Sequence, residues 1–228
     1  MLKGYKVIND LGDIIQKATD IVTKKLKDGD IKQEPDITSQ LLATIETLMI
    51  DYQKNGIVLR TSVLSDRGAN SEESKYGADF IGTLKIRLPF FSVDKGFLAQ
   101  AKLIKNKNKT ISKKDFNDMV EQCKKMLKIT PFSYLVLYTY DGIKVLPAHS
   151  IVNAEYDSMK NLLNIENNFY LKNLRDFYKN HFECFIGDLD FDTTNIDQIY
   201  QKMTDKNLKL ARLDIEIIDK NKFPDCLL

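Results

Sequence analysis

The sequence predicts an α/β protein in which a mixed central sheet is flanked by helices. Apolar residues recur at helical spacing through most of the first fifty positions, and short β-branched or alternating segments follow between residues 57 and 103. The run SYLVLYTY at residues 133–140 is almost continuously apolar or aromatic. The first pattern is typical of amphipathic helices, and the last is typical of a strand buried on both faces. A chain of 228 residues is long enough to form one well-packed domain.

The chain begins with two predicted helices. The first apolar stripe predicts a helix over residues 9–28, which stops at Gly29. The second predicts a helix over residues 36–55, with Gly56 as its C-cap.

Three strands are predicted next, at residues 57–64, 78–88 and 97–103. The polar segment 65–77 is expected to be a loop, and residues 89–96, from a proline to a glycine, are expected to form a turn. Because side chains alternate along a strand, each of these strands should present two different faces.

A basic loop then leads to a predicted helix over residues 113–128, capped by Ser112 or Thr110. The buried strand at residues 133–140 follows, and Asp141-Gly142 turns the chain back.

We expect residues 1–152 to form the core and residues 153–228 to form an extension that packs on it. The patterns of the extension are weaker. They predict a helical stretch at 157–180, a short strand and turn from 181 to about 195, a helix at 195–203 and a strand at 208–218.

Composition limits the functional classes. The formal net charge is only +2, but Lys102 to Lys114 contain six lysines and no acid, and Glu183 to Asp197 contain five acids and no base. No apolar run approaches the roughly 20 residues that span a bilayer, and the N-terminus lacks a signal-peptide core. The three cysteines suggest free thiols in a reducing, cytoplasmic setting. His149 and His181 are the only histidines, and one histidine is too few for a zinc site.

Polar residues are placed unusually on two of the predicted strands. Asp79 opens one strand, and Gln100 and Lys102 share a face of the next. Pairing these strands would bring a carboxylate, an amide and an ammonium together. Folding rarely needs this combination, whereas phosphodiester chemistry at a divalent metal does.

The segments GAD (77–79) and QAK (100–102) resemble the core motif of the PD-(D/E)XK, or restriction-endonuclease-like, nuclease superfamily. The predicted order helix–strand–strand–strand–helix–strand over residues 36–150 agrees with this resemblance. It implies a restriction-endonuclease-like fold and a nuclease dependent on Mg²⁺ or Mn²⁺. Asp79, Gln100 and the Ala101 carbonyl would bind the metal, and Lys102 would orient the attacking water. Gln100 departs from the acidic residue usual at that position and resembles the Q-x-K variant.

The family often adds a glutamate from the helix before the first strand. Glu34, at the start of that helix, and Glu46, inside it, are the two candidates. The N-terminal end of the helix should lie nearer the metal, which favours Glu34. Glu72 and Glu73, in the loop before Asp79, are further candidates.

The basic segment suggests a nucleic-acid contact. Its lysines would hold the phosphate backbone without reading sequence. DNA is favoured as the substrate, and resemblance to nuclease modules of prokaryotic antiviral defence or DNA-processing systems suggests an ATPase or helicase partner subunit. The lysines in question are Lys105, Lys107, Lys109, Lys113 and Lys114.

Two other functions remain open at this point. The first is the same fold with a weak or inactive site, which binds nucleic acid or a partner protein, and Gln100 is its best support. The second is an interaction subunit that docks a partner through its acidic C-terminal surface.

Overall fold

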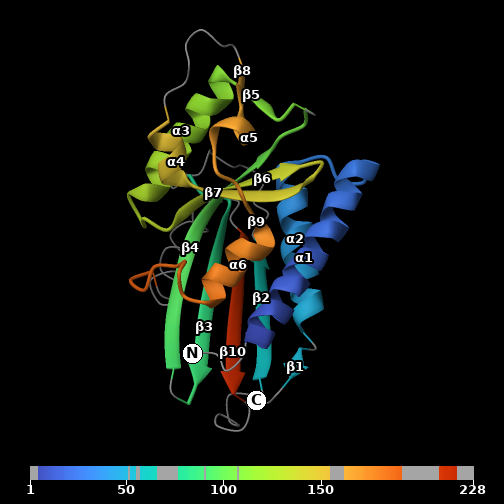
Figure 1. The fold of residues 1–228 in the computed structure, drawn as a ribbon, viewed down its shortest axis with the longest axis vertical. Helices are drawn as coiled ribbons and strands as arrows, with labels where there is room; N and C mark the ends of the chain where they lie inside the picture. The colour runs from blue at the N-terminus through green and yellow to red at the C-terminus, as the bar shows by residue number, and fades with distance from the viewer. Residues whose placement is uncertain are drawn as a thin grey trace.

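The computed structural model describes residues 5–50, 52–54, 57–65, 77–89, 91–106, 108–154, 162–191 and 211–219. Within these residues, eight strands form one mixed sheet in the order β1-β2-β10-β3-β4-β6-β7-β9 (Figure 1). The central pairings are antiparallel between β3 and β4 and parallel between β4 and β6. The strands are β1 (Gln53–Lys54), β2 (Ile57–Ser65), β3 (Phe80–Leu88), β4 (Phe91–Leu103), β6 (Ser133–Thr139), β7 (Gly142–Pro147), β9 (Lys172–Asn173) and β10 (Ala211–Asp219).

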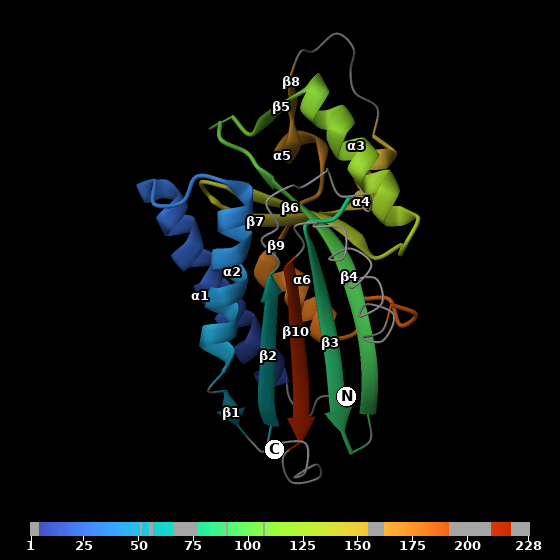
Figure 2. The ribbon, with the colours of Figure 1, turned by 180° about the vertical axis from the view of Figure 1, so that it is seen from behind.

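Helices cover both faces of the sheet, which confirms the predicted α/β class. The long strands β2, β10, β3 and β4 run side by side, and α1 and α2 lie next to β2 (Figures 1 and 2). In both views, α3 and α4 lie above the upper end of β4. A separate pair of short strands, β5 (Thr110–Ser112) and β8 (Leu162–Asn164), lies near α3. The helices are α1 (Tyr5–Asp28), α2 (Glu34–Met49), α3 (Lys113–Leu127), α4 (Ala148–Val152), α5 (Ile165–Asn168) and α6 (Leu174–Phe182).

Two apolar clusters pack the two faces of the sheet. One joins α1, α2 and α6 to one side of the strands, as with Leu41 of α2 and Phe97 of β4. The other joins α3 and α4 to the opposite side, as with Met119 of α3 and Leu98 of β4. Because neighbouring residues of β4 enter different clusters, this strand is buried on both faces.

The C-terminal strand β10 lies inside the sheet, between β2 and β3. It is antiparallel to β2 and parallel to β3, and it contributes Leu213, Ile215 and Ile217 to the larger cluster. The alternation of the sequence predicts this strand, but it gives no information on its neighbours.

Two predicted boundaries near the site are wrong. Helix α2 ends at Met49 with Ile50 as its C-cap, and Gln53–Lys54 form β1, so the helix does not reach residue 55. β4 begins at Phe91, so residues 91–96 are strand and not turn.

The charged residues Asp94 and Lys95 make the first part of β4 difficult to predict as a strand. Lys95 is buried, and its ammonium donates to the carbonyl oxygens of His181 and Ile186, both at 2.6 Å. Asp94 lies 4.0 Å from the ammonium of Lys85 on β3. Both charges therefore have partners inside a strand, which their sequence context does not indicate.

The predicted helix over residues 157–180 is also largely wrong where the structure describes it, from residue 162 onward. Only α6 lies in its second half, and β8, α5 and β9 precede α6. Asn164 and Asn173 each accept a hydrogen bond from a backbone N–H three residues on, and so begin new helices. The predicted helix at 195–203 lies outside the described residues. No helix in the described part of the chain is long and apolar enough to cross a membrane.

Candidate functional site

Asp79 lies where three strands meet. Its backbone N–H donates to the Ala99 carbonyl of β4 (2.8 Å), and its carbonyl accepts from the Ala211 N–H of β10 (2.9 Å). One carboxylate oxygen, Oδ2, accepts from the Ala101 N–H (2.8 Å) and from the side-chain amide of Gln100. Burial raises the pKa of this carboxyl group to about 7, which outweighs the opposing hydrogen bond from Ala101.

Gly77 explains how the chain reaches this position. Its φ is +73°, and a Cβ atom there would lie 2.3 Å from the carbonyl oxygen of Gln122 in α3. Only glycine combines the left-handed conformation with so close an approach. The segment that leads to Asp79 is therefore pressed directly against α3.

Gln100 faces Asp79 with its amide nitrogen. The side chain is buried, and Nε2 donates to Asp79 and to the Ala101 carbonyl (3.2 Å). This hydrogen-bond pattern assigns the orientation of the amide. To offer its oxygen to a cation beside Asp79, the amide of Gln100 has to turn over.

Glu34 is the first residue of α2. Gln33 before it is extended and Pro35 follows in the first turn, where its missing N–H costs no helical hydrogen bond. The Oε2 atom of Glu34 is buried and has no hydrogen-bond partner. Burial raises the pKa of Glu34, while Lys102 and a hydrogen bond from the Leu103 N–H oppose the rise. A buried, unsatisfied carboxylate oxygen is costly for folding and calls for an explanation.

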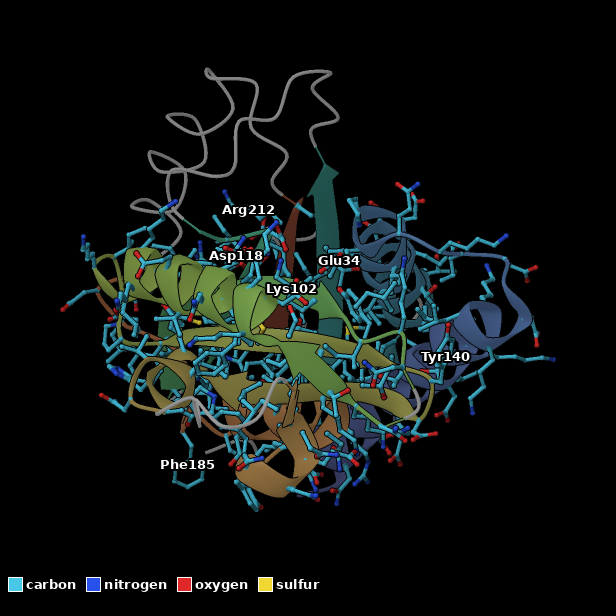
Figure 3. The ribbon with its side chains drawn as sticks, turned by 90° about the horizontal axis from the view of Figure 1, so that it is seen from above. Glu34, Lys102, Asp118, Tyr140, Phe185 and Arg212 are labelled. Atoms are coloured by element: carbon cyan, nitrogen blue, oxygen red, sulfur yellow. The ribbon has the colours of Figure 1, made fainter. Side chains whose placement is uncertain are left out.

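Lys102 interacts electrostatically with both of these carboxyl groups. It lowers the pKa of both Glu34 and Asp79, whereas Glu34 raises that of Asp79. The side chain projects from the same face of β4 as Gln100. Hydrogen bonds and electrostatic interactions therefore connect Glu34, Asp79, Gln100 and Lys102. Figure 3 shows the side chains of Glu34 and Lys102.

Tyr138 of β6 helps to hold Glu34 in place. Thr38 donates to the Glu34 carbonyl oxygen (3.0 Å), and its own oxygen shares a hydrogen bond of 2.7 Å with the Tyr138 hydroxyl. Burial raises the pKa of Tyr138, and the nearby Asp79 and Glu34 raise it further. The sequence indicates only that Tyr138 is a core or groove-lining residue, because its contact lies 100 positions away at Thr38.

Arg212 of β10 was not predicted as part of this end of the molecule. It is buried, its Nε donates to Asp214 (2.7 Å), and Asp214 also accepts from Thr83 of β3. The preceding residue, Ala211, donates its N–H to the Asp79 carbonyl, so Arg212 follows directly after a residue that contacts Asp79. The alternation ARLD puts Arg212 and Asp214 on one face, but the position of β10 beside Asp79 required the structure.

Glu46 does not join the group. It lies twelve residues after Glu34 on the same helix, which is about 18 Å along the axis. Glu72 and Glu73 lie outside the described residues.

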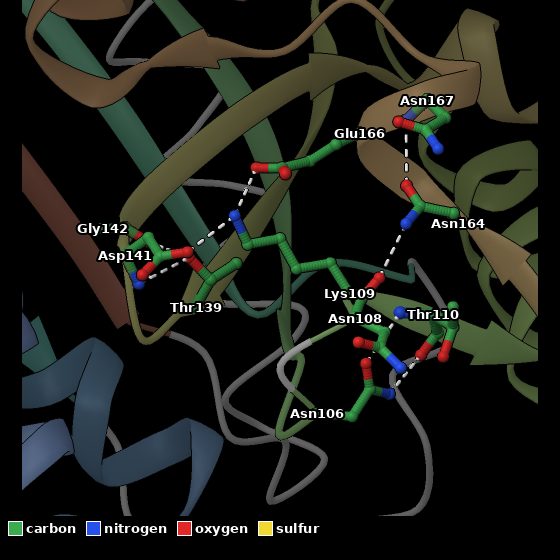
Figure 4. A network of polar contacts seen from close by, with 10 residues as sticks. All are labelled: Asn106, Asn108, Lys109, Thr110, Thr139, Asp141, Gly142, Asn164, Glu166 and Asn167. Atoms are coloured by element: carbon green, nitrogen blue, oxygen red, sulfur yellow. Dashed lines mark hydrogen bonds and ion pairs between the residues drawn. The ribbon is translucent and has the colours of Figure 1, made fainter.

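The predicted phosphate-binding lysines fall into different environments. Lys105, Lys113 and Lys114 are exposed. The charge of Lys105 also opposes the rise in the pKa of Glu34. Lys109 instead binds Asp141 and Glu166, each at 2.7 Å (Figure 4), so its charge is neutralised within the protein. Lys107 lies outside the described residues.

Two carboxyl groups are the candidate metal ligands at this site. Within the described ranges, no group of three or more His, Cys, Asp or Glu side chains is arranged to hold a metal. Glu34 and Asp79 form a pair of enclosed carboxyl groups, and Mg²⁺ typically uses one or two carboxylates with water and substrate oxygens. The unsatisfied Oε2 of Glu34 is the atom that a cation would satisfy.

No family model, no curated protein and no solved structure matches the chain.

Proposed function

We propose that the protein is a Mg²⁺- or Mn²⁺-dependent nuclease with a restriction-endonuclease-like fold, and that its substrate is DNA. The observation that carries this proposal is the enclosed carboxyl pair Glu34 and Asp79 with Lys102 beside it. Two carboxyl groups with raised pKa values and one adjacent ammonium are more typical of a functional site than of a folding device. The resemblance of residues 77–79 and 100–102 to the PD-(D/E)XK motif points to the same chemistry.

Each residue has a separate role in this proposal. Glu34 and Asp79 would hold the ion, which supplies Lewis-acid polarisation of a phosphoryl oxygen when bound. Lys102 would orient water and stabilise charge on the phosphoryl group. Gln100 would hold Asp79 in place, or join the ion after its amide turns over. Arg212 is buried and ion-paired with Asp214, so we assign it no role in binding phosphate.

A second candidate function is supported by one observation. Gln100 and Ala101 already satisfy one oxygen of Asp79 without a metal, so the fold could use these strands only as a binding module for nucleic acid or a partner protein. An ATPase or helicase subunit of a prokaryotic defence system is the kind of partner that the resemblance suggests for either function.

A cleavage assay separates the two. Plasmid and linear DNA are incubated with the protein in Mg²⁺, in Mn²⁺ or in chelator, and products are resolved on a gel. We expect metal-dependent cleavage that Asp79→Ala abolishes and that Lys102→Ala slows by on the order of 10² or more. Glu46→Gln is the matched control and should cleave like the wild type. DNA retention without cleavage by wild-type protein would favour the binding module.

A further inference from the structure

A pocket of about 470 Å³ opens between the end of α1, the loop after β4 and the β6–β7 turn. Its volume lies within the range of small-ligand sites, roughly 300–1,000 Å³. It has no role in the chemistry proposed above. Its lining residues are Lys27, Asn106, Lys109, Thr139, Tyr140 and Asp141.

The walls of the pocket are held by internal hydrogen bonds and ion pairs. Asn106 closes its loop by binding both the N–H and the carbonyl of Thr110. Lys109 joins this loop to Asp141 of the turn and to Glu166 of α5 (Figure 4). Thr139 donates to the Gly142 carbonyl (2.8 Å) and so fixes the turn. The pocket is therefore formed before any ligand enters.

Two lining side chains are left to meet a ligand. Lys27, in the last turn of α1, is exposed and lies near Asp141, but no described residue forms a hydrogen bond or ion pair with its ammonium. Tyr140 is half-buried, and no hydrogen bond from its hydroxyl is found among the described residues. Lys109 is not available, because two carboxylates neutralise it.

An ammonium group and an aromatic ring that line the same pocket fit a nucleotide. Every base has a π-face that can stack on an aromatic side chain, and a lysine ammonium binds phosphate as a point charge. The outer carboxylate oxygen of Asp141, which is largely exposed, can accept from an N–H group of the base. A simple inorganic anion would use Lys27 but would leave the ring of Tyr140 without a role.

The pocket and the candidate metal site are connected through β6. Leu103 of β4 pairs with Tyr138 of β6, and the Ile104 N–H donates to the Tyr138 carbonyl (2.9 Å). Tyr138 is the residue that contacts the helix turn carrying Glu34. Tyr140 therefore follows two positions after a residue of the site.

We propose that this pocket binds one nucleotide, with its base stacked on Tyr140 and its phosphate on Lys27. The part of the proposal that places this nucleotide next to the scissile phosphate of a strand rests on the proposed nuclease function. Nucleotide binding itself requires neither the metal nor Asp79.

Binding is measured by calorimetry in chelator, so that no cleavage occurs. The probes are a mixture of nucleoside 5′-monophosphates, an eight-nucleotide single strand and inorganic phosphate. Lys27→Glu should weaken nucleotide binding by about tenfold, and Tyr140→Leu, which keeps an apolar side chain, by about fivefold or more. Lys17→Glu makes the same charge change on an exposed turn of α1 and should bind like the wild type. Thermal melting of each variant confirms that it is folded.

The outcomes are distinct. Binding of monophosphates that both variants weaken supports the pocket for free nucleotides, and binding of the oligonucleotide alone with the same losses supports a strand as the source. The inference is overturned if neither probe binds, if Lys27→Glu binds as well as Lys17→Glu, or if Tyr140→Leu leaves nucleotide binding unchanged. Loss of the proposed nuclease function would appear separately, as a lack of cleavage in the assay above.

Discussion

Asp79 is the residue with the most perturbed chemistry in the candidate site. Its carboxyl group accepts two hydrogen bonds that favour the charged form, and burial still raises its pKa to about 7. Glu34 adds to this effect, and the pKa of Glu34 is itself raised. Without a cation, the charged form of Asp79 is therefore destabilised by burial and by Glu34. This instability is what a bound metal would relieve.

The raised pKa predicts how stability changes with pH. In metal-free protein, the folded state keeps the proton of Asp79 between about pH 4 and pH 7, where the unfolded state releases it. Its contribution to the free energy of unfolding is therefore full below pH 4 and is lost as pH rises towards 7. Asp79→Asn cannot lose a proton and so removes this loss. The difference in free energy of unfolding between Asp79→Asn and the wild type should therefore be more favourable to the variant at pH 8 than at pH 4, by about 3–4 kcal/mol.

Denaturant unfolding in chelator at several pH values measures this difference. The matched control is Asp118→Asn, which changes an exposed carboxylate on α3. Parallel curves for Asp79→Asn and wild type across the pH range would contradict the assigned burial of Asp79.

At the scale of elements, the site depends on two contacts. One joins α2 to β6, and the other joins the segment before β3 to α3. α2 is tied to β6 through Thr38 and Tyr138, and the chain before β3 is pressed against α3 at Gly77. These contacts place Glu34 and Asp79 more precisely than either helix or strand propensity could. A substitution at the contact of Gly77 with α3 should therefore displace Asp79 although Gly77 itself has no role in the chemistry.

Gly77→Ala tests this dependence. The new Cβ would meet the Gln122 carbonyl oxygen at 2.3 Å in a backbone with φ of +73°, so backbone must shift. We expect the free energy of unfolding to fall by about 1–3 kcal/mol, and we expect metal-dependent cleavage to be lost. Gly29→Ala has a similar φ of +81° but meets only Lys32 Cε at 3.8 Å, and should show the conformational strain alone. Equal melting temperatures for the two variants would show that the contact with α3 is unimportant.

The elements near the site could be predicted because their patterns are local. The Ser112 cap, the β-branched strands and the Q-x-K alternation depend on neighbours a few positions apart. They place Gln100 and Lys102 on one strand, whereas Asp79 lies just before β3 and not inside it. The start of β4 and the break-up of residues 157–180 depend on distant partners. Lys95 finds acceptors at His181 and Ile186, and the position of β10 is decided by pairing across more than 100 residues. Such contacts leave no short-range signal in one sequence.

At the scale of the whole molecule, the charge near the site comes from several elements. Lys102 lies near the end of β4, Lys105 follows this strand, and Lys113 and Lys114 begin α3. This distribution suits a phosphate backbone that passes the carboxyl pair. Because Lys109 is neutralised by Asp141 and Glu166, it should not contribute.

The salt dependence of DNA binding measures these contacts. The double variant Lys105→Ala, Lys114→Ala should weaken binding across sequences and flatten the slope of log affinity against log salt by about 1.8, roughly 0.9 for each lost contact. Lys17→Ala with Lys24→Ala removes the same charge from exposed positions of α1 and should leave the slope unchanged. An equal slope change in both double variants would indicate a general effect of charge and no contact at these lysines.

The most direct test of the central claim is calorimetric titration of Mn²⁺ at pH 8 into the wild type, Glu34→Gln, Asp79→Asn and Glu46→Gln. The claim is that Glu34 and Asp79 together hold one divalent cation. We predict one site in the wild type and in Glu46→Gln, and loss of measurable binding in both Glu34→Gln and Asp79→Asn. Wild-type affinity retained in both of the latter variants would contradict the account.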